Sequence, residues 1–326
     1  MKRRRLLLAG PGLLLLGLAL AQPAARKFRV LVLHSAPIPS GPYHAALKER
    51  LAMHGFVEGK NLVLDAPVVS FTRLNVRQDS AKAFAQKPDV VLAFTSTLTD
   101  DAIALAPKLP LVFVWVADPV KAGLAKDYAR PGGNATGVSN RFAEVAVKRL
   151  ELLRELVPAI RRVAVVGSTF QPELEAAMAG LRVAAPQLGF ELVEVSTSLL
   201  LQLPDLQRAI RNGAEALLPL HVYSAFGARA SGEEIVRLCA QHRIPAIFAE
   251  SELVEVGALI SYGTSLVDDV RRAADILAKI LRGGKPGEIP IDQAAQFELA
   301  VNLRTAHEMK VRIPPAVLAR ASRVIE

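Results

Sequence analysis

The most constraining feature of this sequence is an alternation of short apolar runs with helix-like segments. Runs such as "VVLAF" and "LVFVWV" are bounded by Gly, Pro or polar residues, and segments with helical periodicity separate them. Apolar runs of this length, without polar residues at every second position, are typical of strands buried on both faces of a parallel sheet. The alternation therefore predicts repeated βαβ units.

A second series of the same kind begins near Arg161 and parallels the first. The segment "HGFVEGKNLVLD" corresponds to "LGFELVEVS", "KPDVVLAF" to "GAEALLPL", and "LPLVFVWVAD" to "IPAIFAES". Between the two series lies the Gly-rich stretch "RPGGNATGVSNRF", a composition typical of a boundary between lobes. We therefore expect an α/β fold with two Rossmann-like lobes, each built on a parallel sheet, joined by a hinge.

The expected boundaries divide the chain into four parts. A late helix-like segment, "LVDDVRRAADILAKILRGGKP", ends in two Gly and a Pro and is expected to return the chain to the first lobe. The parts are a signal peptide (1–21), an N-terminal lobe (22–140 and about 265–290), a C-terminal lobe (141–264), and a C-terminal strand and helix that close the hinge region and the lobes (291–326).

The first 21 residues have the order of a secretory signal peptide: a basic start, an apolar run and an Ala-x-Ala site. The apolar run from Leu6 to Leu20 is shorter than the roughly 20 residues that span a membrane. We therefore expect cleavage after Ala21 and a periplasmic protein. No Cys follows the cleavage site, so no lipid anchor is expected, and the sequence leaves Sec or twin-arginine export open.

Composition argues against a nucleic-acid site. The formal net charge is +9, but four of the basic residues belong to the predicted signal peptide, and the others are spread along the chain. Aromatic residues make up only 5% of the chain, too few for base-stacking platforms. Cys239 is the single Cys, so there is no intramolecular disulfide, and its helix-like surroundings predict a role in core packing.

Polar or aromatic residues follow nearly every buried run. Ligands of parallel α/β sheets bind beyond the carboxyl ends of the strands, so these tails are the candidate site. Each such residue could instead cap the next helix, and for Asp118 both possibilities stay open. The tails are His34-Ser35, Thr95-Ser96-Thr97 and Asp118-Pro119 in the first series, and Ser168-Thr169-Phe170, His221, Tyr223, Glu250 and Tyr262 in the second.

Catalytic motifs are absent from the sequence. It contains no GxGxxG after a strand, no GxxxxGK[ST], no GxSxG and no HExxH. Four potential metal ligands come from separate strands, which makes a metal-binding protein a weaker alternative: His34, Asp118, His221 and Glu250. We expect no cofactor, and a binding protein is favoured over an enzyme.

Several phrases, in their order, resemble the periplasmic substrate-binding proteins of ABC transporters, specifically the tryptophan- and tyrosine-type uptake family. They include "GFVEGKNLVLD", "LPLVFVWVADPVKAGLAKDYARPGGNATGVS", "IPAIFAESELVEVGALISYG" and "AVNLRTAHEMKVRIPPAVLARASRVIE", and they cover nearly all of residues 28–326. The run around "ADPV" and "RPGGNATG" is the most specific. The resemblance implies a type I periplasmic-binding-protein fold with a ligand cleft between the lobes and no catalysis.

The resemblance also implies which residues contact the ligand. Two departures matter: His221 stands where relatives often carry an Asp, and Ala249-Glu250 stands where they often carry "SD". In aromatic amino-acid binders such carboxylates would neutralise the ligand ammonium, so His221 puts an amino-acid ligand in doubt, although Glu250 and Asp118 still offer negative charge. The implied contacts are His34, Ser35, Thr95, Ser96, Thr97, Asp118, Pro119, Ser168, Thr169 and Phe170.

Aromatic walls would come from Phe170, Tyr223 and Tyr262, with Tyr43 as a further candidate, although each ring could equally pack in the rim or the core. Trp115 lies within a buried run and is expected to be core.

The expected function is capture of a small solute, with aromatic amino acids as one candidate class. Delivery would be to an inner-membrane ABC permease driven by a cytoplasmic ATPase. We expect a monomer without a nucleic-acid partner. A ligand-binding sensory protein that serves a membrane receptor is the alternative. In either case ligand contacts made by both lobes would shift an open–closed equilibrium towards the closed state.

Overall fold

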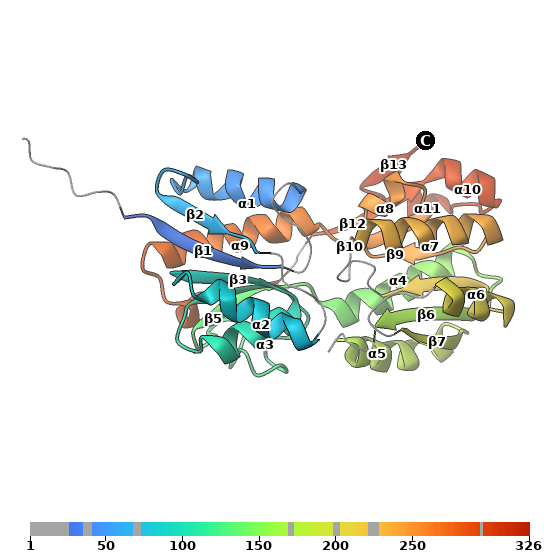
Figure 1. Cartoon of the computed structure of the whole chain (residues 1–326). Coiled ribbons are helices and arrows are strands. Elements are labelled where there is room, and N and C mark those ends of the chain that lie inside the picture. Colours follow the sequence, from blue (N-terminus) through green and yellow to red (C-terminus); the bar gives the residue numbers. More distant parts are fainter. Residues whose placement is uncertain are drawn as a thin grey trace, which may run out of the picture.

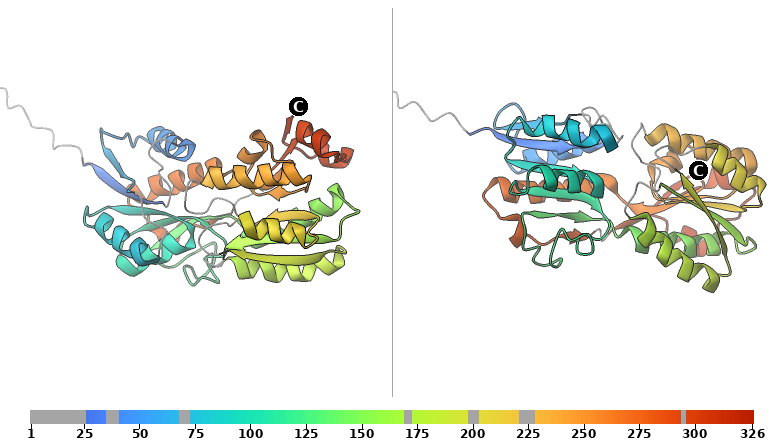
Figure 2. Two further views of the ribbon diagram at one scale, coloured as in Figure 1. Left: turned by 45° about the vertical axis from the view of Figure 1, so that its right-hand side comes forward. Right: turned by 60° about the horizontal axis from the view of Figure 1, so that its bottom comes forward.

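The computed structural model describes residues 26–34, 41–67, 73–168, 173–197, 203–220, 228–293 and 296–326. The predicted signal peptide lies outside these ranges. Within them the chain forms two α/β lobes that lie side by side (Figures 1 and 2). No helix in these ranges is long and apolar enough to cross a membrane.

The first lobe is built on a six-stranded parallel sheet in the order β11-β5-β4-β3-β1-β2. Helices α1 and α9 pack on one face of this sheet, and α2 and α3 pack on the other (Figure 1). The strands are β1 (Phe28–Leu33), β2 (Leu62–Asp65), β3 (Val90–Phe94), β4 (Leu111–Val116), β5 (Ala135–Ser139) and β11 (Asp292–Gln293). The helices are α1 (Pro42–Met53), α2 (Arg73–Phe84), α3 (Thr95–Leu105) and α9 (Leu266–Leu281).

The second lobe repeats the strand order of the first. Its parallel sheet β7-β6-β8 is joined through a parallel bridge between Leu217 and Ala246 to the sheet β13-β12-β10-β9. The order β2-β1-β3-β4 of the first lobe thus corresponds to β7-β6-β8-β9, as the paired phrases of the sequence indicate. The strands are β6 (Arg162–Ser168), β7 (Glu191–Thr197), β8 (Ala216–Pro219), β9 (Ile247–Phe248), β10 (Ile260–Thr264), β12 (Phe297–Asn302) and β13 (Arg323–Ile325).

One pairing of this second sheet is not parallel. Strand β12 runs antiparallel to β10, and β13 then runs parallel to β12. The sheet is therefore mixed, and the C-terminal segment forms its edge. The helices of this lobe are α4 (Phe142–Leu156), α5 (Leu174–Gln187), α6 (Leu203–Arg211), α7 (Ala228–His242), α8 (Glu252–Glu255), α10 (Leu303–Met309) and α11 (Pro315–Leu318). A 3-10 turn, η1 (Pro286–Glu288), follows α9 in the first lobe.

The apolar core of the second lobe lies on both faces of its sheet. Helices α4, α5, α10 and α11 cover one face, and α6, α7 and α8 cover the other. Cys239 of α7 is buried in the second of these faces, and burial raises the pKa of its thiol to about 12. The cysteine therefore packs as a small apolar side chain, as its sequence context predicts.

Strand β4 contains a β-bulge between Val114 and Val116. The bulged residue, Trp115, has φ 64°, a left-handed conformation that is rare for a bulky side chain. Side chains of a regular strand alternate between the faces of a sheet, but the extra residue places Trp115 on the α1–α9 face together with Val114. Val116 then packs on the α2–α3 face. The bulge therefore brings the indole to the face on which Tyr43 of α1 lies.

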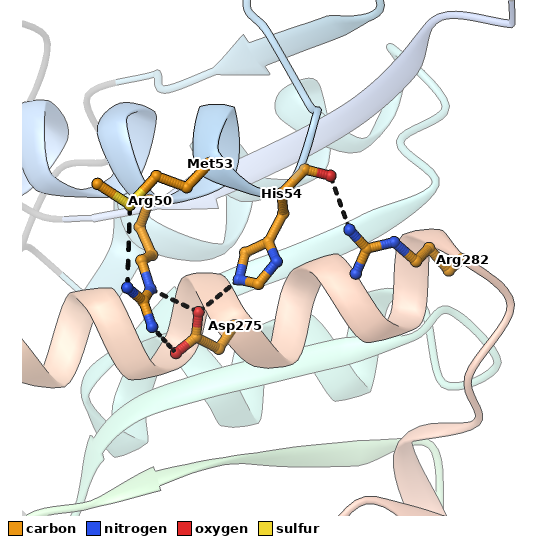
Figure 3. Close-up of polar contacts among 5 residues, drawn as sticks. All are labelled: Arg50, Met53, His54, Asp275 and Arg282. Carbon is orange, nitrogen blue, oxygen red and sulfur yellow. Dashed lines mark hydrogen bonds and ion pairs between the residues drawn. The ribbon is translucent and has the colours of Figure 1, made fainter.

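Helix α9 returns the chain to the first lobe, and charged residues attach it to α1 (Figure 3). Arg50 donates two hydrogen bonds to the carboxylate of Asp275, of 2.7 and 3.0 Å, and the ring of His54 lies 2.6 Å from the same carboxylate. Arg282, just beyond α9, donates to the carbonyl oxygen of His54 at 2.7 Å. These contacts fix the element that follows the crossing from the second lobe.

Candidate functional site

Four rings lie together at the carboxyl ends of β1, β3 and β4. The centroid of His34 is 4.7 Å from that of Phe94 and 6.2 Å from that of Trp115. Trp115 also lies 5.0 Å from Phe94 and 5.8 Å from Tyr43, and all these pairs have edge-to-face geometry. We call His34, Tyr43, Phe94 and Trp115 the ring cluster. His34 and Tyr43 are partly exposed, so the cluster forms an apolar surface with polar edges.

A buried carboxyl group lies beside the ring cluster, in the first turn of α9. Asp269 is 2% exposed and accepts a hydrogen bond of 3.0 Å from Thr264, the last residue of β10. Burial raises the pKa of Asp269 to about 6, although Thr264, Arg272 and Trp115 act in the opposite direction. Asp269 therefore links the end of β10, in the second lobe, to Trp115 of β4, in the first sheet.

Helix α3 carries a contact between the two lobes. Ser96 is buried, and its hydroxyl donates a hydrogen bond to the carboxylate of Glu173, which precedes α5 in the second lobe. Burial, the charge of Glu173 and the charge of Asp101 together raise the pKa of Asp100 on the next part of α3. The amino end of α3 thus faces the amino end of α5.

The threonines at the start of α3 have other surroundings than Ser96. Thr95 has φ 69°, Thr97 is exposed, and Thr99 donates to the carbonyl oxygen of Thr95 at 2.8 Å. No side chain caps α3. The ligand contacts expected for Thr95, Ser96 and Thr97 stay predictions.

The carboxylate of Asp118 forms hydrogen bonds and an ion pair within the first lobe. One carboxylate oxygen accepts hydrogen bonds from the backbone N–H of Lys121, at 3.1 Å, and from the hydroxyl of Tyr128, at 3.4 Å. The other lies 3.5 Å from the ammonium of Lys121. This is the geometry of a residue that caps a turn, and the buried Pro119 begins that turn. A ligand contact by Asp118 remains a prediction.

A pocket lies where the chain crosses between the lobes. Its cavity volume is about 30 Å³, room for one or two water molecules. Only Gly fits at position 263, because a Cβ there would collide with the carbonyl group of Ala249. The pocket is lined by the end of β5 and the start of α4 (Asn140, Phe142, Val145, Arg149), the end of β9 (Ala249, Glu250), and the end of β10 with the start of α9 (Gly263, Thr264, Leu266).

Two charged residues of this pocket are buried, and the sequence pointed to only one of them. Glu250, predicted from its place after a strand, is 2% exposed. Arg149 is fully buried on α4, and its position was not predicted. A signal was present: Phe142, Val145 and Arg149 recur at helical spacing, so a cation lies on the apolar face of an otherwise amphipathic helix.

Tyr262 lies at the other side of the crossing. It is partly buried, and its ring stacks on that of Phe297 with 5.7 Å between centroids and 19° between planes. The guanidinium of Arg141 lies 6.0 Å from the centroid of Phe297. The ring therefore packs on its neighbouring strand at the edge of the crossing.

Several predicted contact residues lie outside the described residues: Ser35, Thr169, Phe170, His221 and Tyr223. Ser168 ends β6, but only its backbone is described. The predicted effect of His221 therefore stays a prediction. Among the described residues, no group of three or more His, Cys, Asp or Glu is arranged to hold a metal ion.

The fold and this arrangement agree with a family of transport proteins. The ABC transporter substrate binding protein family matches residues 43–325, and the chain belongs to this family. It is a family of solute-binding proteins rather than of enzymes, and its members bind small ligands, deliver them to ABC permeases and are typically extracytoplasmic.

Individual relatives support the same assignment. The chain is 25% identical over 250 residues to the "Tyrosine-binding protein" of Clostridioides difficile, which covers 76% of this chain and 70% of the relative. A conserved domain protein from Vibrio cholerae superposes with a TM-score of 0.79 and 26% identity over 92% of this chain and 99% of that one.

A third relative carries a ligand. The ABC domain from Streptococcus pneumonia in complex with L-Trp superposes with a TM-score of 0.75 and 21% identity, again over 92% of this chain and 99% of that one. The expected fold, two α/β lobes of the type I periplasmic-binding-protein class, is confirmed.

Proposed function

We propose that this protein is the solute-binding component of an ABC uptake transporter and that its ligand is an aromatic amino acid. The observation that carries the ligand class is the ring cluster at the carboxyl edge of the first sheet. Aromatic faces and edges attract a further ring in offset or edge-to-face geometry. The names of relatives that bind tyrosine and L-Trp support the same class.

The division of labour between the parts of the chain belongs to the proposal. The N-terminal lobe consists of residues 22–140 and about 265–290, and the C-terminal lobe of residues 141–264. The two lobes close on the ligand, and residues 291–326 complete the hinge region. The protein acts as a monomer, is exported with cleavage after Ala21, hands its solute to an inner-membrane permease and catalyses no reaction. Support comes from the two separate sheets and from the crossings between them.

A thermal-shift panel tests the ligand class on the exported chain. L-tryptophan and L-tyrosine are compared with L-leucine, L-glutamate, D-arabinose and glucose. At a concentration of about 100 times Kd, the true ligand adds roughly 2.7 kcal/mol to the free energy of unfolding. We expect this shift with an aromatic amino acid only.

A pair of variants connects the shift to the ring cluster. Tyr43→Ala removes a partly exposed ring of the cluster and should weaken binding of the aromatic ligand about tenfold. Phe190→Leu, in the core of the second lobe, is the control and should lower the melting temperature without changing affinity. A sugar or an aliphatic amino acid that shifts melting while aromatic amino acids do not would refute the proposed class.

A further inference from the structure

Trp115, the only tryptophan of the chain, is held in its place by its surroundings rather than by a regular strand. Its φ of 64° in the bulge of β4 is strained for a bulky residue, and such conformations persist only where the surrounding structure holds them. Ring contacts with His34, Tyr43 and Phe94 supply part of this hold. The polar edge of the indole, its Nε1–H, is buried as well and therefore needs a hydrogen-bond acceptor.

The carboxyl group of Asp269 lies beside the indole and can accept this N–H. The Nε1–H forms no complete hydrogen bond with any of the described residues, yet the indole acts on Asp269 as a donor that lowers the pKa of its carboxyl. One oxygen of Asp269, Oδ2, accepts a hydrogen bond of 3.0 Å from the hydroxyl of Thr264. Since an ionised carboxylate can accept several hydrogen bonds, it can take the indole N–H as a further donor.

Asp269 changes its charge close to neutral pH. Burial is the largest influence on this carboxyl group and raises its pKa to about 6. Below this pH the group carries a proton, so it is a weaker acceptor and becomes a donor itself. Protonation thus takes away the charge-assisted hydrogen bond that the indole can form with the carboxylate.

The charged groups around Asp269 act in both directions. Arg272, one turn further along α9, favours the ionised carboxylate, and the neighbouring Asp268 opposes it. Arg272 is shared with Asp292 of β11, from which it lies 3.1 Å away. The carboxylate of Asp269 therefore has no cation to itself, and its hydrogen-bond donors help to decide its charge.

Two imidazoles lie near the same structure. His34 contacts the indole edge-to-face, with 6.2 Å between the ring centroids, and imidazoles titrate in the same range of pH. His44 lies on α1, which packs along α9; burial lowers its pKa, and the charges that act on it are those of Glu58 and Lys48. A pH effect on Trp115 thus has two candidate sources, Asp269 and His34, and substitution separates them.

We propose that the carboxylate of Asp269 positions Trp115 by accepting its indole N–H, and that protonation of Asp269 releases the indole and weakens ligand binding by the ring cluster. The effect on the ligand rests on the proposed function, whereas the effect on Trp115 needs no ligand. Asp269 acts through Trp115 and is a positioning residue. Because the ionised state holds the ring in place, ligand affinity rises with pH between about 5 and 7.

Fluorescence of the single tryptophan tests the positioning without a ligand. The emission of Trp115 in the unaltered protein should change between about pH 4.5 and about pH 8, with a midpoint near pH 6. Asp269→Asn keeps an acceptor oxygen that does not titrate, so its emission should stay constant over this range. His34→Gln should keep the transition. Asp268→Asn is the matched control, because Asp268 is 38% exposed and pairs with Arg271, and it should keep the transition too.

Calorimetric titration with L-tryptophan and L-tyrosine, at about pH 5 and about pH 7, tests the consequence for binding. The unaltered protein should bind about fivefold more weakly at the lower pH, because the ligand meets a ring that is no longer fixed. Asp269→Asn should bind equally, within about twofold, at both pH values. Asp269→Leu offers no acceptor and should bind at both as weakly as the unaltered protein does at the lower pH. A role of Asp269 in packing alone predicts no such dependence on pH.

Three results decide the outcome. Constant emission of the unaltered protein, or a transition that persists in Asp269→Asn, would overturn the positioning of Trp115 by Asp269. A transition that requires Asp269, together with equal ligand affinities at the two pH values, would overturn the effect on binding. If the transition requires Asp269 and no aromatic amino acid binds at either pH, the positioning is supported and the proposed ligand class is wrong.

Discussion

At the scale of single residues, the buried carboxyl group of Asp269 makes the stability of the first lobe depend on pH. Burial raises its pKa from 3.8 to about 6 in the folded protein. The unfolded chain therefore releases this proton at lower pH than the folded chain does, and the free energy of unfolding falls as pH rises from about 4 to about 6.

Asp269→Asn should remove this loss. At pH 7 the variant should be more stable than the unaltered protein by roughly 2 to 3 kcal/mol, and near pH 3.5 the two should be equal. Urea unfolding at a series of pH values measures the difference. Asp268→Asn, on the exposed side of the same turn, is the control, and a parallel pH dependence of Asp269→Asn and the unaltered protein would contradict the argument.

Asp118 gives a second prediction for a single residue. Because its carboxylate accepts hydrogen bonds from the backbone of Lys121 and from Tyr128, Asp118→Ala should lower the free energy of unfolding by about 1 kcal/mol. Ligand affinity measured by calorimetry separates the two roles of Asp118. An affinity within about twofold of that of the unaltered protein leaves Asp118 as a cap alone, and a large loss of affinity supports the predicted ligand contact.

Candidate site residues at strand ends can be predicted from the sequence, whereas a buried residue within a helix cannot. Glu250 and Asp118 follow apolar runs, so their position at a strand end was visible in the sequence. Arg149 lies in the middle of a helix, and what makes it notable is burial at the ends of β8 and β9, which only the packing of α4 establishes. Trp115 was expected in the core and is 8% exposed, yet its φ of 64° does not follow from its neighbours in the sequence.

At the scale of elements, charged side chains attach α9, which follows β10 of the second lobe, to α1 of the first lobe. Burial would raise the pKa of Asp275, but hydrogen bonds from Arg50 and His54 outweigh it and hold the pKa below its usual value. Stability from this carboxylate is therefore present above the pKa of the unfolded chain and is lost as pH falls through the lower folded value.

Asp275→Ala should lower the free energy of unfolding by about 1 kcal/mol at pH 7, because all three groups are partly exposed. The difference should shrink towards pH 3. Denaturant unfolding at both pH values checks this. Arg271→Ala breaks an exposed pair within α9 and should change stability by no more than about 0.5 kcal/mol; equal effects of the two substitutions would show that the contact to α1 adds nothing.

The elements themselves were largely predictable, and the reasons are physical. Strands such as β3 and β4 are buried on both faces, which requires uninterrupted apolar residues, and helices between them need a polar face. The bulge in β4 was not predictable, because "LVFVWV" suits a regular strand equally well and only the pairing with β5 reveals the extra residue. The antiparallel β12 was likewise hidden, since an apolar run does not encode its direction.

At the scale of the whole molecule, the hydrogen bond from Ser96 to Glu173 spans the two lobes. A movement that separates α3 from α5 breaks it, so it favours the closed arrangement, in which we propose that both lobes contact the ligand. Ser96→Ala should weaken ligand binding about fivefold, the effect expected for one hydrogen bond to a charged group that is partly exposed. Calorimetry measures this.

Ser322→Ala is the matched control, since the hydroxyl of Ser322 donates to the carbonyl oxygen of Leu299 within the second lobe. It should leave the affinity unchanged. If Ser96→Ala alters thermal stability but binds ligand as tightly as the unaltered protein, the contact supports the fold and has no influence on lobe closure.

The return of α9 and β11 to the first sheet also governs the order in which the chain can mature. A polypeptide synthesised from its amino end presents residues 26–139 well before residues 266–293, so the first sheet initially has one face without its helix α9. The second sheet likewise waits for β12 and β13. Each lobe therefore needs residues that follow most of the other lobe in the sequence, and the chain has to stay unaggregated until its last sixty or so residues are available.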